Sequence, residues 1–376
     1  MSKSALPNAQ GVGVRLSFLQ SRLHLDGLLL TALLAVAAFG VAVLYSAFGQ
    51  DWGQTQQQII RASVGFAALL VCAQIPPRTL QRWSLWIFSL GIALLLLVMA
   101  KGIVNQGAQR WIELGPVHFQ PSELMKLALP LMVARLLSEH DVPPRPSRVL
   151  LALALIAAPT LLIALQPDLG TAVLVAASGL FVLFLAGIGR GWILGGLTAL
   201  GAGAPLLWFF AMHDYQRERV MTFLNPESDP LGAGYHIIQS QIAIGSGGLF
   251  GKGWLNGTQA HLEFIPERHT DFVLAVVAEE FGLVGVAQLL TVYLIIVGRG
   301  LYIAGSAQEN FPRLVAGALT LTFFTYVLVN AGMVSGLLPV VGLPLPLVSF
   351  GGSSLVTIMA AFGMIMAAHT HRRLWP

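Results

Sequence analysis

Charged residues are scarce in this sequence of 376 residues. Lysine, arginine, aspartate and glutamate together make up 10% of the chain, whereas hydrophobic residues make up 56%. A soluble domain carries about a quarter charged residues, so this composition excludes an ordinary soluble enzyme. The mean hydropathy of +0.75 and the long apolar runs are typical of a protein that crosses a membrane several times. The formal charge of +4 says little by itself, and we expect no nucleic-acid partner.

Cysteine is almost absent, which excludes further classes of site. The single thiol, Cys72, leaves no intramolecular disulfide and no thiolate metal site. It lies in an apolar run and is typical of a small buried hydrophobe. The nine histidines show no HExxH spacing, so we expect no zinc site. The first apolar run is too long for a signal peptide, and we expect it to be retained as a membrane span.

The apolar runs predict an all-α polytopic integral membrane protein with about ten transmembrane helices. Each run is long enough to span at about 20 residues. The expected spans are 26–48, 58–75, 81–100, 123–139, 149–166, 169–188, 191–212, 272–298, 313–338 and 350–369. They form a single membrane domain over residues 26–370, with short tails at 1–25 and 371–376.

Basic residues between the predicted spans indicate the orientation. Arginine and lysine concentrate in cytoplasmic links, and an even number of spans places both termini in the cytoplasm. The basic residues used are Lys3, Arg15, Arg22, Arg78, Arg82, Arg145, Arg148, Arg190, Arg299, Arg313, Arg372 and Arg373. The outward loops are then 101–123, the long loop 213–270 between the seventh and eighth helices, and 337–354. We expect the second part of the long loop to lie at the membrane interface.

The stretch FIPERHTDF (264–272) crowds ionisable groups at the mouth of an apolar run. Glu267, Arg268, His269 and Asp271 fall within five positions. One interpretation is a helix start, in which Thr270 is the cap and the acid lies in the first turn. The other is a functional site, because ionisable groups at the edge of a membrane bundle are costly.

A second cluster follows in GAQRWIELGPVHFQPSELMK (107–126). Ser122 is a candidate N-cap, and Glu123 and Lys126 are three residues apart on one helix face. An exposed pair of this kind contributes only about 0.2–0.5 kcal/mol. Here the helix continues into apolar sequence, where a charged pair is better tolerated than a lone lysine. Arg110 adds a guanidinium suited to forked contact with phosphate.

Three further stretches are candidates for the same site. Asp168, in QPDLGT, is either a helix cap or a site residue, and the sequence leaves both open. PVVGLPLPLVSFGGSSL (339–355), with Ser349 and Ser353, is irregular backbone in a membrane protein and must be buried or line a cavity. Glu279 and Glu280 lie deeper, and we expect them to support the site by bonding a neighbouring helix.

The outward clusters bring together acids, cations and glycine-rich backbone. A lipid-linked sugar pyrophosphate fits such a set, because cations hold phosphate, a carboxylate takes a proton and the lipid lies against the bundle. A divalent cation, Mg²⁺ or Mn²⁺, could bridge a carboxylate and the pyrophosphate, although the sequence shows no dedicated ligand set.

Four motifs resemble those of the SEDS family (shape, elongation, division and sporulation). They are QPSELMK (120–126), QPDLGT (166–171), FIPERHTDFVLAVVAEEFG (264–282) and PLPLVSFGGSS (344–354), and the likeness extends over roughly residues 26–370. PERHTDF and QPSE are more similar to the rod-shape branch, RodA, than to the division branch, FtsW.

The resemblance implies a ten-helix SEDS fold and a peptidoglycan glycosyltransferase that polymerises lipid II at the outer face of the bacterial inner membrane. It implies that Asp271 is the catalytic residue. Arg110, Glu123, Lys126, Arg268, His269, Asp168, Ser349 and Ser353 are then candidates for binding the substrate and its pyrophosphate. The implied partners are a class B penicillin-binding protein and the elongation proteins MreC and MreD.

Two other functions compete with this interpretation. A lipid II flippase would use intramembrane charges as a transport path, but here the polar clusters concentrate on the outward side. A non-catalytic scaffold for the transpeptidase would tolerate the loss of Asp271. The pKa of Asp271 is open at this point, because a helix N-terminus lowers it whereas burial or the charge of Glu123 raises it.

Overall fold

The computed structural model describes residues 23–370, apart from 106–107, 115–116, 140–142, 212–216, 218–220, 223–232 and 262–266. The two predicted tails therefore lie almost entirely outside the described residues. So does most of the first half of the predicted long loop 213–270, and so do residues 264–266 of the FIPERHTDF stretch.

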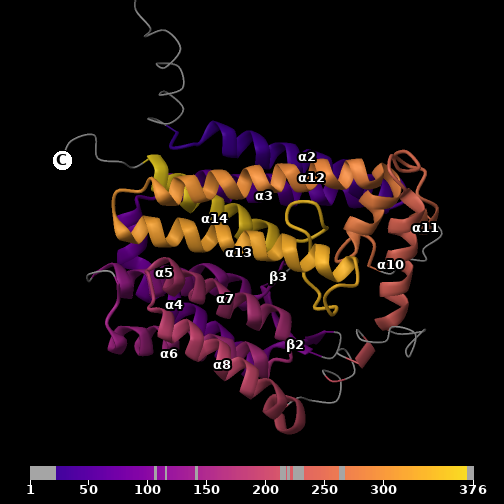
Figure 1. The fold of residues 1–376 in the computed structure, drawn as a ribbon. Helices are drawn as coiled ribbons and strands as arrows, with labels where there is room; N and C mark the ends of the chain where they lie inside the picture. Colours follow the sequence, from indigo (N-terminus) through magenta and orange to yellow (C-terminus); the bar gives the residue numbers. More distant parts are fainter. Residues whose placement is uncertain are drawn as a thin grey trace, which may run out of the picture.

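Long helices form a bundle (Figure 1). Most residues of α5, α13 and α14 are buried. Helix α3 packs along α14, α12 packs against α13 and α2, and α4 to α7 form the other side of the bundle. The long helices are α2 (Gly27–Ala47), α3 (Trp52–Gln74), α4 (Pro77–Lys101), α5 (Pro121–Ser138), α6 (Pro146–Leu165), α7 (Leu169–Leu185), α8 (Arg190–Leu206), α12 (Val273–Gly305), α13 (Asn310–Val334) and α14 (Ser353–Thr370).

Each of the ten predicted spans coincides with one of these helices, so the prediction of a helical polytopic membrane protein is confirmed. Within the described residues, seven helices are long and apolar enough to cross a membrane, and α7 is apolar but shorter. Helices α3 and α5 fall outside that set. The first begins with a glutamine-rich turn, and the second carries Glu123, Lys126 and Arg135. The total of ten spans stays a prediction.

A small antiparallel sheet follows α4, a feature that the sequence did not predict. Strands β1 (Ile103–Asn105), β2 (Ala108–Leu114) and β3 (Val117–Phe119) pair in that order. The register sets Trp111 opposite Ile103 and Ile112 opposite Phe119. The sheet lies at one end of the bundle with α10 (Ala233–Gly247) and α11 (Thr258–His261), on the right in Figure 1. We call this the sheet end, and the turn from α12 to α13 marks the opposite end.

Helix α12 is interrupted at Gly282, whose backbone has φ 67° and ψ −167°. The break frees backbone groups that a membrane protein must satisfy internally. A turn that follows α10 supplies the partners. The amides of Lys252 and Gly253 donate to the carbonyls of residues 279 and 280, and the amides of residues 283 and 284 donate to carbonyls 248 and 249, at 2.9–3.1 Å. A side chain at 282 would collide with this turn. The first two turns of α12 are thus a separate segment tied to the α10 region.

Candidate functional site

A cavity of about 430 Å³ opens among β2, the N-terminal ends of α5, α7 and α14, and the loop that precedes α14. Four segments remote in sequence meet there, each through one of the predicted polar clusters. The cavity is lined by Arg110, Trp111, Gln120, Glu123, Lys126, Pro167, Asp168, Leu169, Gly170, Thr171, Asp271, Val340, Val341, Gly342, Leu343, Pro344, Gly351, Gly352, Ser353 and Ser354. The structure therefore brings six of the predicted catalytic and binding residues together: Asp271, Arg110, Glu123, Lys126, Asp168 and Ser353.

Asp271 lies in the turn just before α12 and faces this cavity. Burial, with a smaller contribution from the carboxylate of Glu267, raises the pKa of Asp271 to about 6. Among the described residues, no group donates a hydrogen bond to its carboxylate, whose Oδ2 lies 3.4 Å from the Cβ position of Gly342. A carboxylate that receives no hydrogen bond from the described residues and has a pKa near neutrality is suited to accept a proton.

The turn that carries Asp271 is held by buried polar groups. The side-chain amide of Asn330, on α13, donates to the carbonyl of Asp271 at 2.8 Å and to the carbonyl of Leu343 at 2.7 Å. The hydroxyl of Ser349 donates to the carbonyl of Thr270, and the amide of Phe350 donates to the carbonyl of His269 at 2.7 Å. The turn and the loop before α14 thus fix each other in place.

Two more helices hold the irregular loop before α14. Tyr293 of α12 donates its hydroxyl to the carbonyl of Pro346 at 2.5 Å, and Gln58 of α3 donates its amide to the carbonyl of Ser349 at 3.3 Å. Non-helical backbone inside a membrane protein needs such partners. The loop lines the cavity, as the sequence predicted. Its irregular backbone is tolerated because side chains from three helices, α3, α12 and α13, donate hydrogen bonds to its carbonyl groups.

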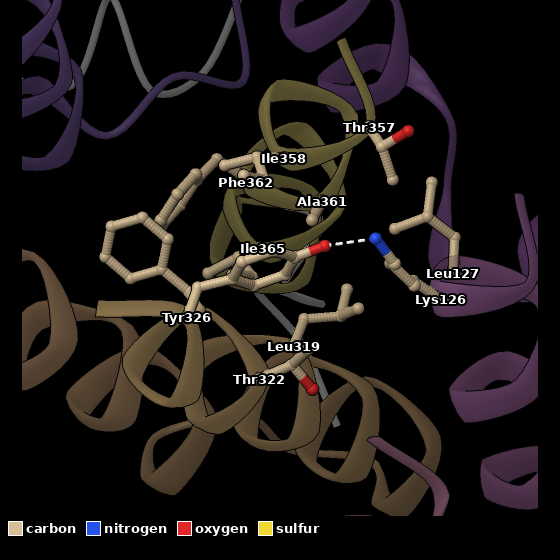
Figure 2. A pocket seen from close by; sticks show the side chains of 11 residues that line it. Lys126, Leu127, Leu319, Thr322, Tyr326, Thr357, Ile358, Ala361, Phe362 and Ile365 are labelled. Atoms are coloured by element: carbon tan, nitrogen blue, oxygen red, sulfur yellow. Dashed lines mark hydrogen bonds between the residues drawn. The ribbon is translucent and has the colours of Figure 1, made fainter. Parts of the chain in front are cut away.

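Glu123 and Lys126 form a buried ion pair in the first turn of α5. Lys126 Nζ lies 2.6 Å from Glu123 Oε1, and both side chains are about 5% exposed. The ammonium also donates to the hydroxyl of Tyr326, on α13, as Figure 2 shows. Oε2 of Glu123 is buried and has no hydrogen-bond partner among the described residues. Both residues of the pair line the cavity.

Arg110 and Asp168 form the opposite wall. Arg110 donates to the carbonyls of Gln166 and Pro167, and its Nε lies 3.8 Å from Asp168 Oδ2. Asp168 accepts from the amide of Gln120 at 3.2 Å and caps α7 by accepting from the backbone amide of Thr171 at 3.2 Å. The cap interpretation of Asp168 is therefore confirmed, and its role in the site stays a prediction, although the residue also lines the cavity.

Three predicted binding residues do not line the cavity. Arg268 donates to the carbonyl of Ala47 at the end of α2. His269 packs against Phe48 and Phe350, and burial lowers its pKa. The Ser349 hydroxyl accepts from the amide of Leu345 inside the loop and donates to the carbonyl of Thr270 in the Asp271 turn. These contacts hold the Asp271 turn, and direct binding of pyrophosphate by these three residues finds no support in the geometry.

Two local predictions about helix caps are wrong. Thr270 does not cap α12, which begins at Val273, because its hydroxyl bonds the Glu267 carboxylate at 2.6 Å. Ser122 does not cap α5, because the helix begins one residue earlier at Pro121, a residue favoured in the first helical position.

Glu279 and Glu280 make contacts of the predicted supporting kind. Glu279 is fully buried and accepts from Lys252 Nζ at 2.7 Å and from the backbone amide of Gln259 at 2.9 Å. Glu280 accepts from the hydroxyl of Ser46 on α2. They tie the segment of α12 that follows Asp271 to the turn after α10 and to α2.

Two residues near the site, Tyr326 and Asn330, were not predicted from the sequence. Both are buried on α13, four residues apart, and therefore lie on one helix face. One contacts the cavity lysine and the other holds the Asp271 turn. The available signal was weak: a polar side chain inside an apolar run is costly in a membrane and usually has a partner.

Comparisons with known proteins agree with this geometry. The family model described as "Cell cycle protein", which carries the names FtsW, RodA and SpoVE, matches residues 23–374. Peptidoglycan glycosyltransferase MrdB of Escherichia coli is 56% identical over 353 residues, which are 94% of this chain and 95% of that protein. Probable peptidoglycan glycosyltransferase FtsW of Trichlorobacter lovleyi is 36% identical over 370 residues, covering 93% of this chain and 94% of that protein.

Solved structures share the fold. A chain from a structure described as "Structural coordination of polymerization and crosslinking by a peptidoglycan synthase complex" matches with a TM-score of 0.81 at 32% identity, over 93% of this chain and 99% of that chain. The rod shape determining protein RodA of Thermus thermophilus matches with a TM-score of 0.70 at 31% identity, over 92% and 96%. The sequence resemblance is confirmed, and the chain belongs to the FtsW, RodA and SpoVE family of cell cycle proteins.

Proposed function

We propose that this chain, a peptidoglycan glycosyltransferase of the RodA type, polymerises lipid II with Asp271 as the general base. The supporting observation is the placement of Asp271. Its partly buried carboxylate faces a polar cavity, is free of hydrogen bonds from the described residues and has a pKa raised to about 6. The names of the relatives support the reaction class.

In the proposed step, Asp271 takes the proton of the GlcNAc 4-hydroxyl of the acceptor lipid II. The oxygen forms a bond to C1 of the terminal MurNAc of the donor. The bond from C1 to the phosphate oxygen breaks, undecaprenyl pyrophosphate leaves and the anomeric centre inverts. General base catalysis contributes about 10²–10⁴-fold to such a step.

Arg110 and Lys126 are placed to stabilise the leaving pyrophosphate. Both line the cavity, and each uses only some of its N–H groups on protein acceptors among the described residues. The N-terminus of α14, with Ser353, also lines it and favours an anion. Fixed donors around a leaving anion lower the barrier because they need not reorganise during the reaction.

The charge balance of the cavity supports a divalent cation that arrives with the substrate. Its described lining holds three acids, Glu123, Asp168 and Asp271, against two cations, Arg110 and Lys126. Within the described residues no three acidic, histidine or cysteine side chains form a metal site. The pyrophosphate itself would therefore supply most ligands to Mg²⁺ or Mn²⁺, with a carboxylate of the cavity lining as a protein ligand. Chelation with EDTA should stop polymerisation, and either metal should restore it.

The same proposal places the protein in the bacterial inner membrane with both termini cytoplasmic and the sheet end in the periplasm. The supporting observation is that Arg299 and Arg313 flank the turn from α12 to α13, at the opposite end of the bundle. Residues 1–25 and 371–376 would be cytoplasmic tails, and 213–270 a periplasmic loop of the single domain 26–370. A class B penicillin-binding protein would be a partner, to which the synthase complex among the structural relatives lends support. MreC and MreD would be further partners.

One assay separates this function from transport and from scaffolding. Purified protein and a class B penicillin-binding protein, with the transpeptidase blocked by a β-lactam, are given lipid II in detergent. Glycan ladders would establish the transferase. Absence of ladders, together with lipid II translocation in vesicles, would establish the flippase. Absence of both, with partner binding intact, would leave the scaffold.

A further inference from the structure

Lys126 separates two cavities of different character. Its side chain lines the polar cavity that contains Asp271 and also a small apolar cavity of about 30 Å³, enclosed by α5, α13 and α14 (Figure 2). Tyr326 lines only the apolar one, on the side away from the proposed substrate. Its ring is buried, and its hydroxyl points at the lysine ammonium in Figure 2.

The ammonium of Lys126 can donate three hydrogen bonds. One goes to Glu123 Oε1 at 2.6 Å and one to the Tyr326 hydroxyl. No acceptor among the described residues takes the third, and the Lys126 side chain lines the polar cavity, the more favourable of its two cavities for an N–H group. The two protein acceptors thus aim the remaining donor at the cavity.

Glu123 could hold the lysine in a different way, because its Oε2 has no partner among the described residues. Without the tyrosine hydroxyl, the ammonium would gain most by pairing with both carboxylate oxygens. That shift would withdraw its third N–H from the cavity.

We propose that Tyr326 is a positioning residue that keeps Lys126 aimed at the pyrophosphate of a lipid-linked substrate. It does not touch the substrate and acts through the lysine. This inference rests on the proposed function for the identity of the ligand. A hydrogen bond to a charged group is involved, so loss of the hydroxyl should weaken pyrophosphate binding about 10- to 100-fold.

The test measures binding of undecaprenyl pyrophosphate, with undecaprenyl phosphate for comparison, to the full-length protein in nanodiscs. Tyr326→Phe keeps the ring and removes only the hydroxyl. Thr322→Val is the matched control, because Thr322 lies one turn earlier on α13, lines the same apolar cavity and bonds only its own helix at Ala318. Tyr326→Phe should bind pyrophosphate at least tenfold more weakly, and Thr322→Val should bind as wild type does.

A double-mutant cycle shows whether the tyrosine acts through the lysine. In the Lys126→Gln background, Tyr326→Phe should cause no further loss of binding. Additive losses, equal losses in Tyr326→Phe and Thr322→Val, or wild-type binding by Tyr326→Phe would each overturn the inference. If Tyr326→Phe does not fold, 3,5-difluorotyrosine at 326 keeps the shape and weakens the acceptor, and binding should be intermediate; unchanged binding would overturn the inference.

The binding assay and the polymerisation assay distinguish failure of the inference about Tyr326 from failure of the proposed function. If wild-type protein binds undecaprenyl pyrophosphate but makes no glycan, the proposed function is wrong and the binding cycle still decides the role of Tyr326. If wild type polymerises lipid II and Tyr326→Phe matches it in both assays, only the inference about Tyr326 is wrong.

Discussion

Two aspartates, one at each end of the bundle, have opposite surroundings. Asp26, at the opposite end, is 1% exposed and is saturated: it caps α2 through the amide of Leu29, accepts from Arg299 at 2.7 Å and lies 3.3 Å from His369 Nδ1. Asp271, at the sheet end, receives no hydrogen bond on its carboxylate from the described residues. The first joins the ends of three helices, whereas the second retains its capacity to take a proton. Asp26 is thus a structural acid, whereas the open carboxylate of Asp271 fits the general base that we propose.

The largest effect on stability is expected at Asp26. Asp26→Asn keeps the helix cap, since asparagine caps as well as aspartate, but loses the charge that Arg299 and His369 face. The free energy of unfolding should fall by about 2 kcal/mol. Polymerisation per folded molecule should stay at the wild-type rate. Denaturant titration with a parallel lipid II assay checks both. Loss of activity without loss of stability would show that Asp26 is not a purely structural acid.

Two glycine substitutions test whether the space beside Asp271 is needed for polymerisation. Gly342 has φ +70°, and a Cβ there would lie 3.4 Å from Asp271 Oδ2, whereas Gly187 has φ +78° and open space around it. Alanine at either position should cost about 1 kcal/mol of stability, because both backbones are left-handed. Only Gly342→Ala should also lower the polymerisation rate, since its methyl group enters the cavity. Equal rates for the two variants would show that the space beside Asp271 is not used.

The pH profile reports the surroundings of Asp271. Its pKa is raised to about 6, so the base form is complete above that pH and is lost as the pH falls through it. The rate should therefore be half-maximal near pH 6 and level off above. The linked stability has the opposite trend, because a raised carboxyl pKa means that unfolding becomes easier as the pH rises through about 6. A rate that is constant down to pH 4 would contradict the assignment.

The smallest expected change comes from Glu267, whose charge is the second cause of the raised pKa of Asp271. Glu267→Gln removes that charge, so the pH at which the polymerisation rate is half-maximal should fall by a fraction of a unit. The plateau rate should not change. The same profile measured in high salt gives the control, because an exposed charge is screened there. A half-maximal pH that rises instead would show that the repulsion has been assigned the wrong sign.

Much of the fold follows from the sequence because membrane spans are long and continuous. Ten apolar runs predicted ten helices, and the observed helix ends differ from the predicted ones by at most seven residues. The small sheet was missed because its strands have three to seven residues, too short for a periodic signal. The break at Gly282 was missed too, since one glycine in an apolar run has no local meaning until the turn after α10 is seen against it.

The site was predictable where polar residues stand out from apolar sequence. Asp271, Lys126 and Asp168 do so, and the cavity brings them together. Arg268 and His269 stand out equally, yet they contact α2 and the loop before α14. The direction in which a side chain of this turn points depends on tertiary packing, and a local sequence pattern holds no information about that packing.

The rate of lipid II polymerisation by Asp271→Asn tests the central claim most directly. The substitution preserves shape and removes the proton acceptor, and Asp26→Asn measured alongside controls for loss of a buried charge. We expect glycan ladders from wild type and from Asp26→Asn. The rate of Asp271→Asn should be at least about 10²-fold lower, and its free energy of unfolding should be no lower than that of wild type. Ladders from Asp271→Asn at the wild-type rate would remove Asp271 from the mechanism and contradict the account.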